Sequence, residues 1–540
     1  MIDAEAGSAV ARRPISWPGA RDYRAGLSLI ILLSFSLCLA VLLTGKQIFQ
    51  ANWGIIDDFE IFTFLGPDLH LPIGEVWHTL LTKTEVGTLQ GRFRPGFYTF
   101  RLLEAAIWGP NVHLWYFSNT MGFAIFLGSC AWMMSRFVGT LLSAILTAYL
   151  AVLPLWAGIW SRLGTSEING AASVGVILFA AYGVFFGERA TSRNVSAAAL
   201  TAGTLMLIGA KETFLPLAGG SLAILAIASF RRRIPAWPSI LWGLVIVAGV
   251  GAIALVAARQ VSAAGGDFYA KPIALWTTIE PAIKGLWSAA RSTVLIYAVP
   301  ILACWRLAAA GSIPSRKFAE ATLVVLLIYA FLLLMYASQC ALYRAQFPQW
   351  NRYDFPAMLI VPASFCVMAC YSLHMAQCMR AIVVAKVLAV LIGVAGASAA
   401  IVKYRADPLP AAVQANIDVT NAFFRELQRA IDSAKQSPEQ PIILEAYGVN
   451  AYEGVYSLRT YLQTFGVKNS ISVRVHSSGN SDSPLNSRLE SALLSMEQDG
   501  APGLVPLERI SDSKGCISIG IEGAPDSRCL GFEVKAEIGS

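Results

Sequence analysis

Long apolar runs dominate the chain from about residue 25 to about residue 402. The runs are roughly 20 residues long, the length at which an α-helix crosses a bilayer, and the first is long enough to stay as an anchor. The pattern predicts about eleven membrane-spanning helices, near 25–45, 111–132, 137–154, 168–187, 195–211, 214–230, 238–258, 291–308, 319–338, 355–374 and 380–402.

Two regions depart from this pattern. The loop over about 46–110 contains two segments, 74–83 and 94–109, whose apolar spacing is typical of amphipathic helices lying along the membrane interface. The tail alternates instead between expected helices over 416–436, 452–466 and 485–500 and expected strands over 441–447, 470–476 and 515–521. We therefore expect a polytopic all-α transmembrane domain over 1–404 and a small C-terminal α/β domain over 405–540.

Charge gives the expected orientation in the membrane. The chain is 56% hydrophobic and 14% charged, with a net charge of +7, and its Lys and Arg residues concentrate before the first span and in every second connection after it. Such connections are typically cytoplasmic, so the N-terminus is expected inside and the tail, after an odd number of spans, outside. We expect a multi-pass protein of the inner (cytoplasmic) membrane whose outer face meets the periplasm. Membrane topology explains the positive charge, and no nucleic-acid partner is inferred.

Other charged motifs sort to the outer side, in five separate connections. They are Asp57, Asp58 and Glu60 in the acidic segment NWGIIDDFEIF (residues 52–62), Arg92 and Arg94 in GRFRPGFY, Arg162 and Glu167 in SRLGTSEING, Lys211 and Glu212 in GAKETF, and Arg352, Tyr353 and Asp354 in QWNRYDFP. Charges buried at a membrane boundary must pair or bind something, so the five motifs together predict an outward-facing site. Taken singly, each could be a hydrated loop, an interfacial anchor or an ion pair between helix ends.

Three of these motifs carry a family resemblance. The acidic pair after the first span, the RFRP element before the second and the RYDFP element entering a late span resemble the GT-C class of membrane glycosyltransferases, over about residues 25–400. That class includes protein O-mannosyltransferases and the aminoarabinose transferases that act on lipid A. The resemblance implies a GT-C-like fold and a sugar donor carried on a polyprenyl phosphate. The sugar would pass with inversion to a hydroxyl of an acceptor glycan, lipid or protein.

The resemblance also implies roles for the charged residues. Asp57 or Asp58 would be the general base that takes the acceptor proton, and Asp58 is slightly preferred because adjacent residues in an extended segment point in opposite directions. Arg352 is the first candidate to bind the donor phosphate, followed by Arg94, Lys211 and Arg162. The supporting residues are Glu60, Arg92, Glu167, Glu212 and Tyr353.

A metal site and a disulfide are the remaining chemical questions. No metal ligands are assigned, because the second outer loop lacks an acid pair and the histidines match no ligand motif, although a divalent cation stays compatible with the resemblance. Cys516 and Cys529 flank ISIGIEGAPDSR in the tail, which suits a disulfide across a hairpin in an oxidising compartment. Two unpaired thiols are the alternative.

Sugar transfer has three alternatives. A lipid-linked glycan flippase or transporter should carry charge near mid-bilayer, where the predicted spans have almost none. A glycan polymerase or ligase would share the donor and the membrane face, so the sequence separates it poorly from a glycosyltransferase. A scaffold for assembly has no evident need for five charged outer connections.

Overall fold

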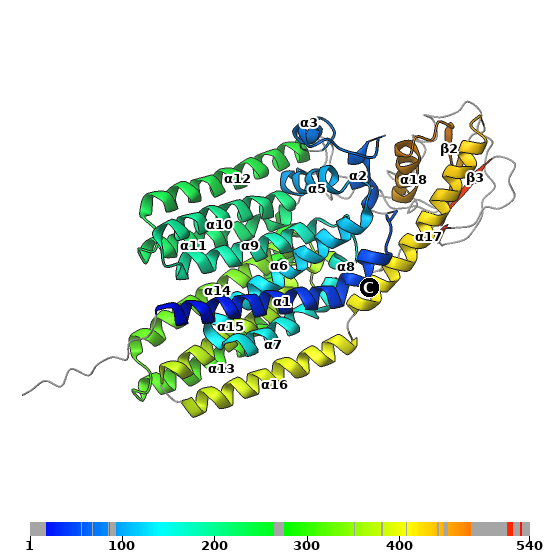
Figure 1. The fold of residues 1–540 in the computed structure, drawn as a ribbon. Coiled ribbons are helices and arrows are strands. Elements are labelled where there is room, and N and C mark those ends of the chain that lie inside the picture. Colours follow the sequence, from blue (N-terminus) through cyan, green and yellow to red (C-terminus); the bar gives the residue numbers. More distant parts are fainter. Residues whose placement is uncertain are drawn as a thin grey trace, which may run out of the picture.

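Long helices packed side by side form the body of the protein (Figure 1). The computed structural model describes residues 18–55, 57–66, 68–84, 86, 93–263, 275–349, 351–379, 382–406, 408–439, 442–447, 452–476, 516–521 and 530–531. The long helices are, in chain order, α1 (Pro18–Gln50), α6 (Val112–Val138), α7 (Thr140–Ala151), α9 (Ser166–Phe186), α10 (Ala190–Ala210), α11 (Ala218–Phe230), α12 (Ala236–Ala263), α13 (Leu275–Ala309), α14 (Ser315–Tyr343), α15 (Ile360–Cys378) and α16 (Ile382–Ala406).

Length and apolarity identify the helices that can cross a membrane. Among the described residues, nine helices pass this test, and ten pass if one bent pair counts as a single span. The prediction of a polytopic, mainly helical membrane protein is therefore confirmed, with fewer clear spans than the eleven expected.

Two of the expected spans account for the difference. The span expected over 137–154 is the bent pair, in which α7 is followed after a 57° bend by η3 (Pro154–Trp156) and α8 (Ala157–Trp160). The bend falls at a proline, which cannot continue the hydrogen-bonding of the preceding helix. The span expected over 195–211 lies in α10, a 21-residue helix that is not among the nine. Its neighbours α9, α12 and α5 (Pro95–Trp108) cover much of its surface, so α10 tolerates polar residues that a lipid-facing helix would not.

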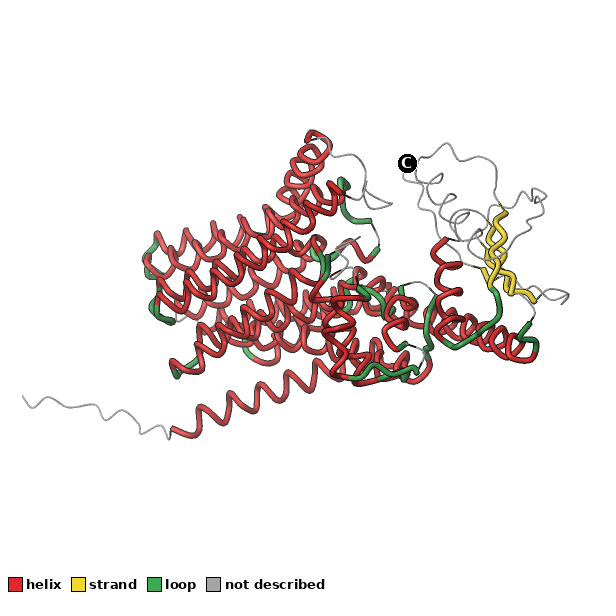
Figure 2. The backbone as a smooth tube through the Cα atoms, turned by 90° about the horizontal axis from the view of Figure 1, so that it is seen from above, coloured by secondary structure: helices red, strands yellow, loops and turns green. Residues whose placement is uncertain are grey.

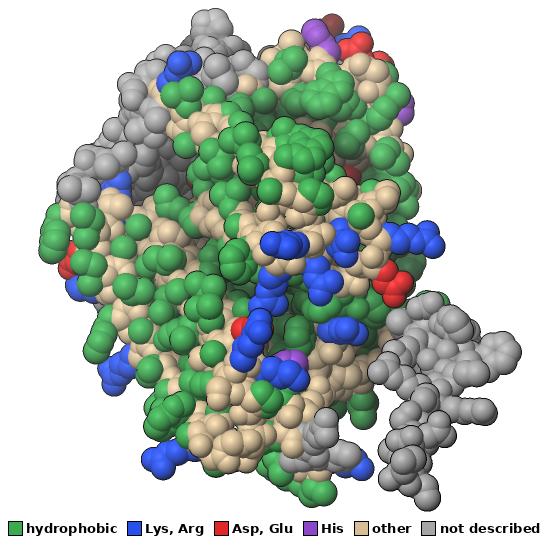
Figure 3. All heavy atoms as spheres, turned by 90° about the vertical axis from the view of Figure 1, so that its left-hand side faces the viewer, with side chains coloured by type: hydrophobic (Ala, Val, Ile, Leu, Met, Phe, Trp, Pro, Cys, Tyr) green, Lys and Arg blue, Asp and Glu red, His purple; other side chains and the backbone are tan. Residues whose placement is uncertain are grey.

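Basic side chains gather at the end of the bundle where α1 begins. Figure 3 looks onto this end and shows Lys and Arg side chains spread among apolar ones, with few acidic groups. The connections that turn here carry Arg136, Arg189, Arg193, Arg231, Arg232, Arg233, Arg316 and Lys317. The two ends of the helical bundle therefore differ in chemistry.

Short helices cover the opposite end, where the chain passes from α1 to α6. They are α2 (Asp58–Phe62), η1 (Thr63–Leu65), η2 (Ile73–Glu75), α3 (Val76–Thr82) and α5. Pro95 is the first residue of α5, a position where the missing N–H of proline costs nothing. Helices α3 and α5 occupy the two segments with amphipathic spacing, which confirms that both are helical.

The chain after α16 combines two helices with a four-stranded sheet (Figure 2). The elements are α17 (Pro408–Gln436), β1 (Ile442–Tyr447), α18 (Tyr452–Thr464), β2 (Ile471–His476), β3 (Cys516–Ile521) and β4 (Leu530–Gly531). The strand order is β2-β1-β3-β4, with β1 parallel to β2 and antiparallel to β3. Helix α18 makes the crossover that two parallel strands require. The helix expected over 485–500 lies outside the described residues, and the division of the chain near residue 404 stays a prediction.

Helices α17 and α18 pack onto the end of the bundle that carries the acidic segment. Helix α17 contacts α1 and α8, and α18 contacts α2. The amide of Asn421 on α17 donates to the carbonyl of Gln50 at the end of α1, at 2.8 Å. The Phe62 ring of α2 lies 4.8 Å from the Tyr461 ring and 5.1 Å from the Phe465 ring, between centroids. The chain after α16 is thus joined directly to the acidic segment.

Candidate functional site

The acidic segment places its two aspartates in different surroundings. Asp57 has φ 66° and ψ −35°, a positive φ that is uncommon for residues other than glycine, and it occupies the N-cap position of α2 without a capping hydrogen bond from its side chain. Asp58 is the first residue of α2 and only 3% exposed, whereas the side chain of Asp57 is 25% exposed. Of the two aspartates, only Asp57 presents an accessible carboxylate.

Backbone amides hold the carboxylate of Asp58. Its Oδ2 accepts from the N–H of Gly54 at 2.8 Å, and its Oδ1 accepts from the N–H of Gly164 at 3.0 Å. Burial raises the pKa of Asp58 to about 7, while the two amides act in the opposite direction by stabilising the charged form. Asp58 therefore ties the acidic segment to the connection between α8 and α9.

Arg352, which lies shortly before α15 in the chain, forms an ion pair with Asp57. Arg352 is the first residue of η5 (Arg352–Asp354) and is itself 25% exposed on its side chain. Burial acts to lower its pKa, but the carboxylates of Asp57 and Glu167 outweigh burial and raise it well above the usual value. The guanidinium of Arg352 is thus a permanent cation at a partly open position.

Two glycines allow this close approach. A Cβ on Gly164 would lie 2.3 Å from the Cβ of Asp57, and a Cβ on Gly158 would lie 2.9 Å from the backbone nitrogen of Arg352. Both distances are shorter than side chains tolerate. Glycine at these two positions lets the backbone of α8 and of the connection that follows it touch both partners of the ion pair.

Glu167 and Lys211 form a second ion pair, which is more deeply buried than the first. Glu167 lies in the first turn of α9, Lys211 directly follows α10, and both side chains are buried. The ammonium nitrogen of Lys211 also lies 4.4 Å from the ring centroid of Tyr353 and 5.6 Å from that of Tyr343. Cation–π contacts and the ion pair together fix Lys211 in place.

Arg94 and Glu212 form the third ion pair, nearer to the surface. The Nε of Arg94 lies 3.4 Å from Oε2 of Glu212, and Nη2 lies 3.5 Å from Oε1. Arg94 is mostly buried and Glu212 is exposed. Burial acts to lower the pKa of Arg94, yet Glu212, with Glu167 further away, raises it above its usual value.

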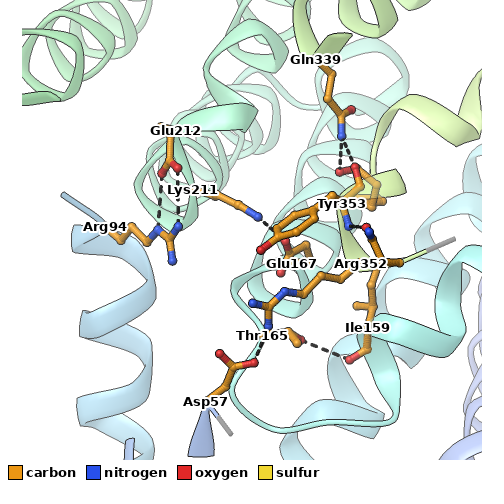
Figure 4. A network of polar contacts seen from close by, with 12 residues as sticks. Asp57, Arg94, Ile159, Thr165, Glu167, Lys211, Glu212, Gln339, Arg352 and Tyr353 are labelled. Carbon is orange, nitrogen blue, oxygen red and sulfur yellow. Dashed lines mark hydrogen bonds and ion pairs between the residues drawn. The ribbon is translucent and has the colours of Figure 1, made fainter. Parts of the chain in front are cut away.

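The three pairs lie together and form one ion-pair cluster (Figure 4), made of Asp57, Arg352, Glu167, Lys211, Arg94 and Glu212. Its members come from all five of the charged motifs that the sequence singled out. Glu167 acts on Arg352 and Arg94 as well as on Lys211, so the pairs are electrostatically linked. The cluster holds three fixed cations beside an accessible carboxylate, which suits an anionic ligand and a proton transfer.

Some expected site residues lie beside the cluster or outside the described residues. Glu60 accepts a hydrogen bond from the Tyr98 hydroxyl, and the side chain of Arg162 is exposed and is not part of the cluster. Arg92 and Cys529 fall outside the described residues, as does the side chain of Cys516. The predicted disulfide therefore stays a prediction.

A buried ion pair in α5 escaped the sequence analysis. Arg101 donates from Nη1 to Oε2 of Glu104 at 2.7 Å and from Nη2 to the carbonyl of Leu163. Burial raises the pKa of Glu104, which Arg101 counteracts. Two opposite charges three residues apart on a helix expected at an interface are typical of an ordinary surface pair, so this contact cannot be recognised from the sequence. By holding Leu163, Arg101 supports the amide of Gly164 that binds Asp58.

A metal site needs several His, Cys, Asp or Glu side chains close together. Within the described parts of the chain, no three His, Cys, Asp or Glu side chains come together where they could hold one. The carboxylates of the cluster are each paired with Arg or Lys instead. These residues do not fit a multi-carboxylate metal site, and no step proposed below passes through a metal.

Comparison with known proteins adds no relative. No protein-family model matches the chain, and neither a curated protein nor a solved structure does.

Proposed function

We propose that the protein is a membrane glycosyltransferase that moves a sugar from a polyprenyl-phosphate donor to an acceptor hydroxyl. The acceptor would be an envelope glycan, lipid or protein. The observation that supports this most is the ion-pair cluster, which places three fixed cations and the partly exposed carboxylate of Asp57 at a single end of a bundle of apolar helices. A lipid-linked phosphate, an acceptor hydroxyl and a proton acceptor can meet there.

The chemistry of the two ends supports an orientation. Basic connections cluster at the end where α1 begins (Figure 3), and the ion-pair cluster lies at the other. With the basic end in the cytoplasm, the site faces the periplasm at the outer surface of the inner membrane. In this arrangement α17, α18 and the sheet form a small α/β domain on the periplasmic side.

We assign the role of general base to Asp57 rather than to Asp58. Both oxygens of Asp58 accept from backbone amides, and its side chain is almost fully buried. The carboxylate of Asp57 is a quarter exposed and meets only a side chain partner, Arg352, among the hydrogen bonds described for it. A base must reach the proton it removes, and this exposure favours Asp57.

Arg352 is assigned to the phosphate of the donor. A phosphate placed beside its guanidinium would compete with the carboxylate of Asp57 for the same donors. Binding of the donor would thereby free Asp57 to accept a proton. The ion pair with Arg352 holds the base in place until the donor phosphate takes over the guanidinium.

The transfer is then a single displacement at the anomeric carbon of the sugar. The acceptor oxygen attacks the anomeric carbon as its proton passes to Asp57, and the bond between that carbon and the phosphate oxygen breaks with inversion. The departing polyprenyl phosphate takes up the electron pair, and Arg352 stabilises the negative charge on it. Lys211 and Arg94 are less accessible than Arg352, so we assign them to the wider positive field around the phosphate.

Mass spectrometry of cell-envelope glycans and lipids tests this function. Cells with the wild-type protein should contain a glycosylated envelope component that is absent both without the protein and with Asp57→Asn. Glu188→Gln, an exposed carboxylate at the basic end, is the matched control and should restore the product. A flippase or transporter would give a different result, because Asp57→Asn would leave the product in place. A product lengthened by whole repeat units would indicate a polymerase or ligase.

A further inference from the structure

Helices α17 and α18 both form hydrogen bonds with the acidic segment. From α17, Thr420 accepts from the backbone N–H of Asn52 at 3.2 Å, and Asn421 accepts from the side-chain amide of Asn52 at 2.7 Å. From α18, the hydroxyl of Tyr461 donates to the carbonyl of Gly54 at 2.7 Å. The residues that lead into Asp57 are therefore held by a part of the chain some 400 positions away.

Gly54 links Tyr461 to the aspartates. Its carbonyl accepts from Tyr461, and its N–H donates to Oδ2 of Asp58. A Cβ on Gly54 would lie only 3.0 Å from that same oxygen. Because one residue carries both bonds, the Tyr461 hydroxyl fixes the backbone that presents the amide to Asp58.

The ring of Tyr461 has a separate packing role. Tyr461 is fully buried and its ring contacts Phe62 and Phe423, with centroids 4.8 Å and 5.5 Å apart. A phenylalanine would keep these ring contacts and remove only the hydroxyl. The carbonyl of Gly54 would then lose the partner that fixes its orientation.

We propose that α17 and α18 hold the acidic segment in its working geometry, with Tyr461 as a positioning residue that acts through Gly54 on Asp58 and hence on Asp57. This inference rests on the proposed function, because the working geometry is that of the base. It makes the C-terminal helices a support of the reaction centre, and it assigns Tyr461 no contact with donor or acceptor.

The proposal predicts a change in pH dependence. The charged or titratable groups that face Asp58 are Asp57 beside it, Arg101 from α5, Tyr116 from α6 and Tyr461 from α18. Burial raises the pKa of Asp58 to about 7, and the amide of Gly54 restrains that rise. A looser Gly54 stabilises the carboxylate less, so the pKa of Asp58 rises further when the Tyr461 hydroxyl is removed.

Tyr461→Phe in the full-length protein, reconstituted in lipid nanodiscs, is the test variant. The control is Thr460→Val, which removes a hydroxyl that donates to the carbonyl of Tyr456 in its own helix. Hydrogen exchange followed by mass spectrometry reports on peptides that cover residues 50–62. We expect exchange there to rise at least ~10-fold in Tyr461→Phe and to stay unchanged in Thr460→Val.

Sugar transfer measured across pH 5–9 is the second readout, and it separates positioning from a general loss of folding. A misfolded fraction lowers the rate equally at every pH. Because the working geometry needs an ionised Asp58 that accepts from both amides, we expect the acid limb of the profile instead to move to higher pH by about one unit in Tyr461→Phe. Unchanged exchange, or an acid limb that stays in place, would overturn the proposal while leaving the proposed function standing. Absence of transfer by the wild-type protein would overturn the proposed function, and exchange alone would then decide whether α18 holds the acidic segment.

Discussion

Arg352 and Asp57 form an ion pair although they are 295 positions apart in the chain. The contact joins the middle of the acidic segment to the short helix η5 ahead of α15, and it brings a partly exposed carboxylate to a fixed cation. In the proposed reaction, the donor phosphate replaces the carboxylate of Asp57 on Arg352.

Arg352→Gln should weaken the use of the lipid-phosphate donor. A charge-assisted contact to a phosphate contributes about 1.5–3 kcal/mol, so we expect KM for the donor to rise roughly 10- to 100-fold. The donor KM of Arg352→Lys should lie between those of Arg352→Gln and the wild type, because an ammonium keeps the charge and loses the bidentate geometry. Arg231→Gln, at the basic end, serves as the control. Equal donor KM values in the Arg352 variants and the control would remove Arg352 from the site.

Gly164→Ala should disturb the base without removing any polar group. The added methyl would fall 2.3 Å from the Cβ of Asp57, so the acidic segment must shift. A misplacement of about 1 Å at a reacting group costs on the order of 100-fold in rate, and we expect kcat to fall by about that factor. Gly219→Ala is the matched control, because a Cβ there meets nothing within 4 Å. Wild-type kcat in Gly164→Ala would contradict the contact between these two segments.

The buried pair of Lys211 and Glu167 should matter most for stability. Lys211→Met leaves the carboxylate of Glu167 buried without its partner, which costs about 3–5 kcal/mol. Adding Glu167→Gln removes the stranded charge, so the double variant should regain much of the lost thermal stability. Melting temperatures in one detergent measure both effects. A double variant no more stable than Lys211→Met would show that the pair is not coupled.

The sequence predicts features that arise from neighbouring residues, and it does not predict contacts between residues far apart in the chain. Long apolar runs identified the helical bundle, and the proline at 154 and the covered surface of α10 account for the spans that differ. The charged connections were recognised because a charge beside an apolar run is conspicuous. Their pairing could not be predicted, since Asp57 meets Arg352 only after the helices between them have packed. Arg101 and Tyr461 resemble ordinary helix residues in sequence, and only tertiary contacts give them a role.

The stability of the protein should depend on pH through Asp58. Its pKa is about 7 in the folded protein, compared with an ordinary value of 3.8. Between these values the folded protein keeps a proton that the unfolded chain loses, so stability decreases as pH rises from about 4 to about 7. The amide side chain in Asp58→Asn has no titratable proton in this pH range. The melting temperature of the wild type minus that of Asp58→Asn should therefore fall as pH is raised from 5 to 8, and a constant difference would contradict the raised pKa.

Transfer of a radiolabelled sugar from a polyprenyl-phosphate donor by purified Asp57→Asn tests directly whether Asp57 is the general base. Protein in nanodiscs would be incubated with the donor and with an extract of envelope acceptors, and Glu188→Gln would be measured in parallel. Loss of a general base typically lowers the rate by about 10²- to 10⁴-fold, and we expect such a loss in Asp57→Asn with donor binding retained. Transfer by Asp57→Asn at the rate of Glu188→Gln and the wild type would contradict the assignment of Asp57 as the base.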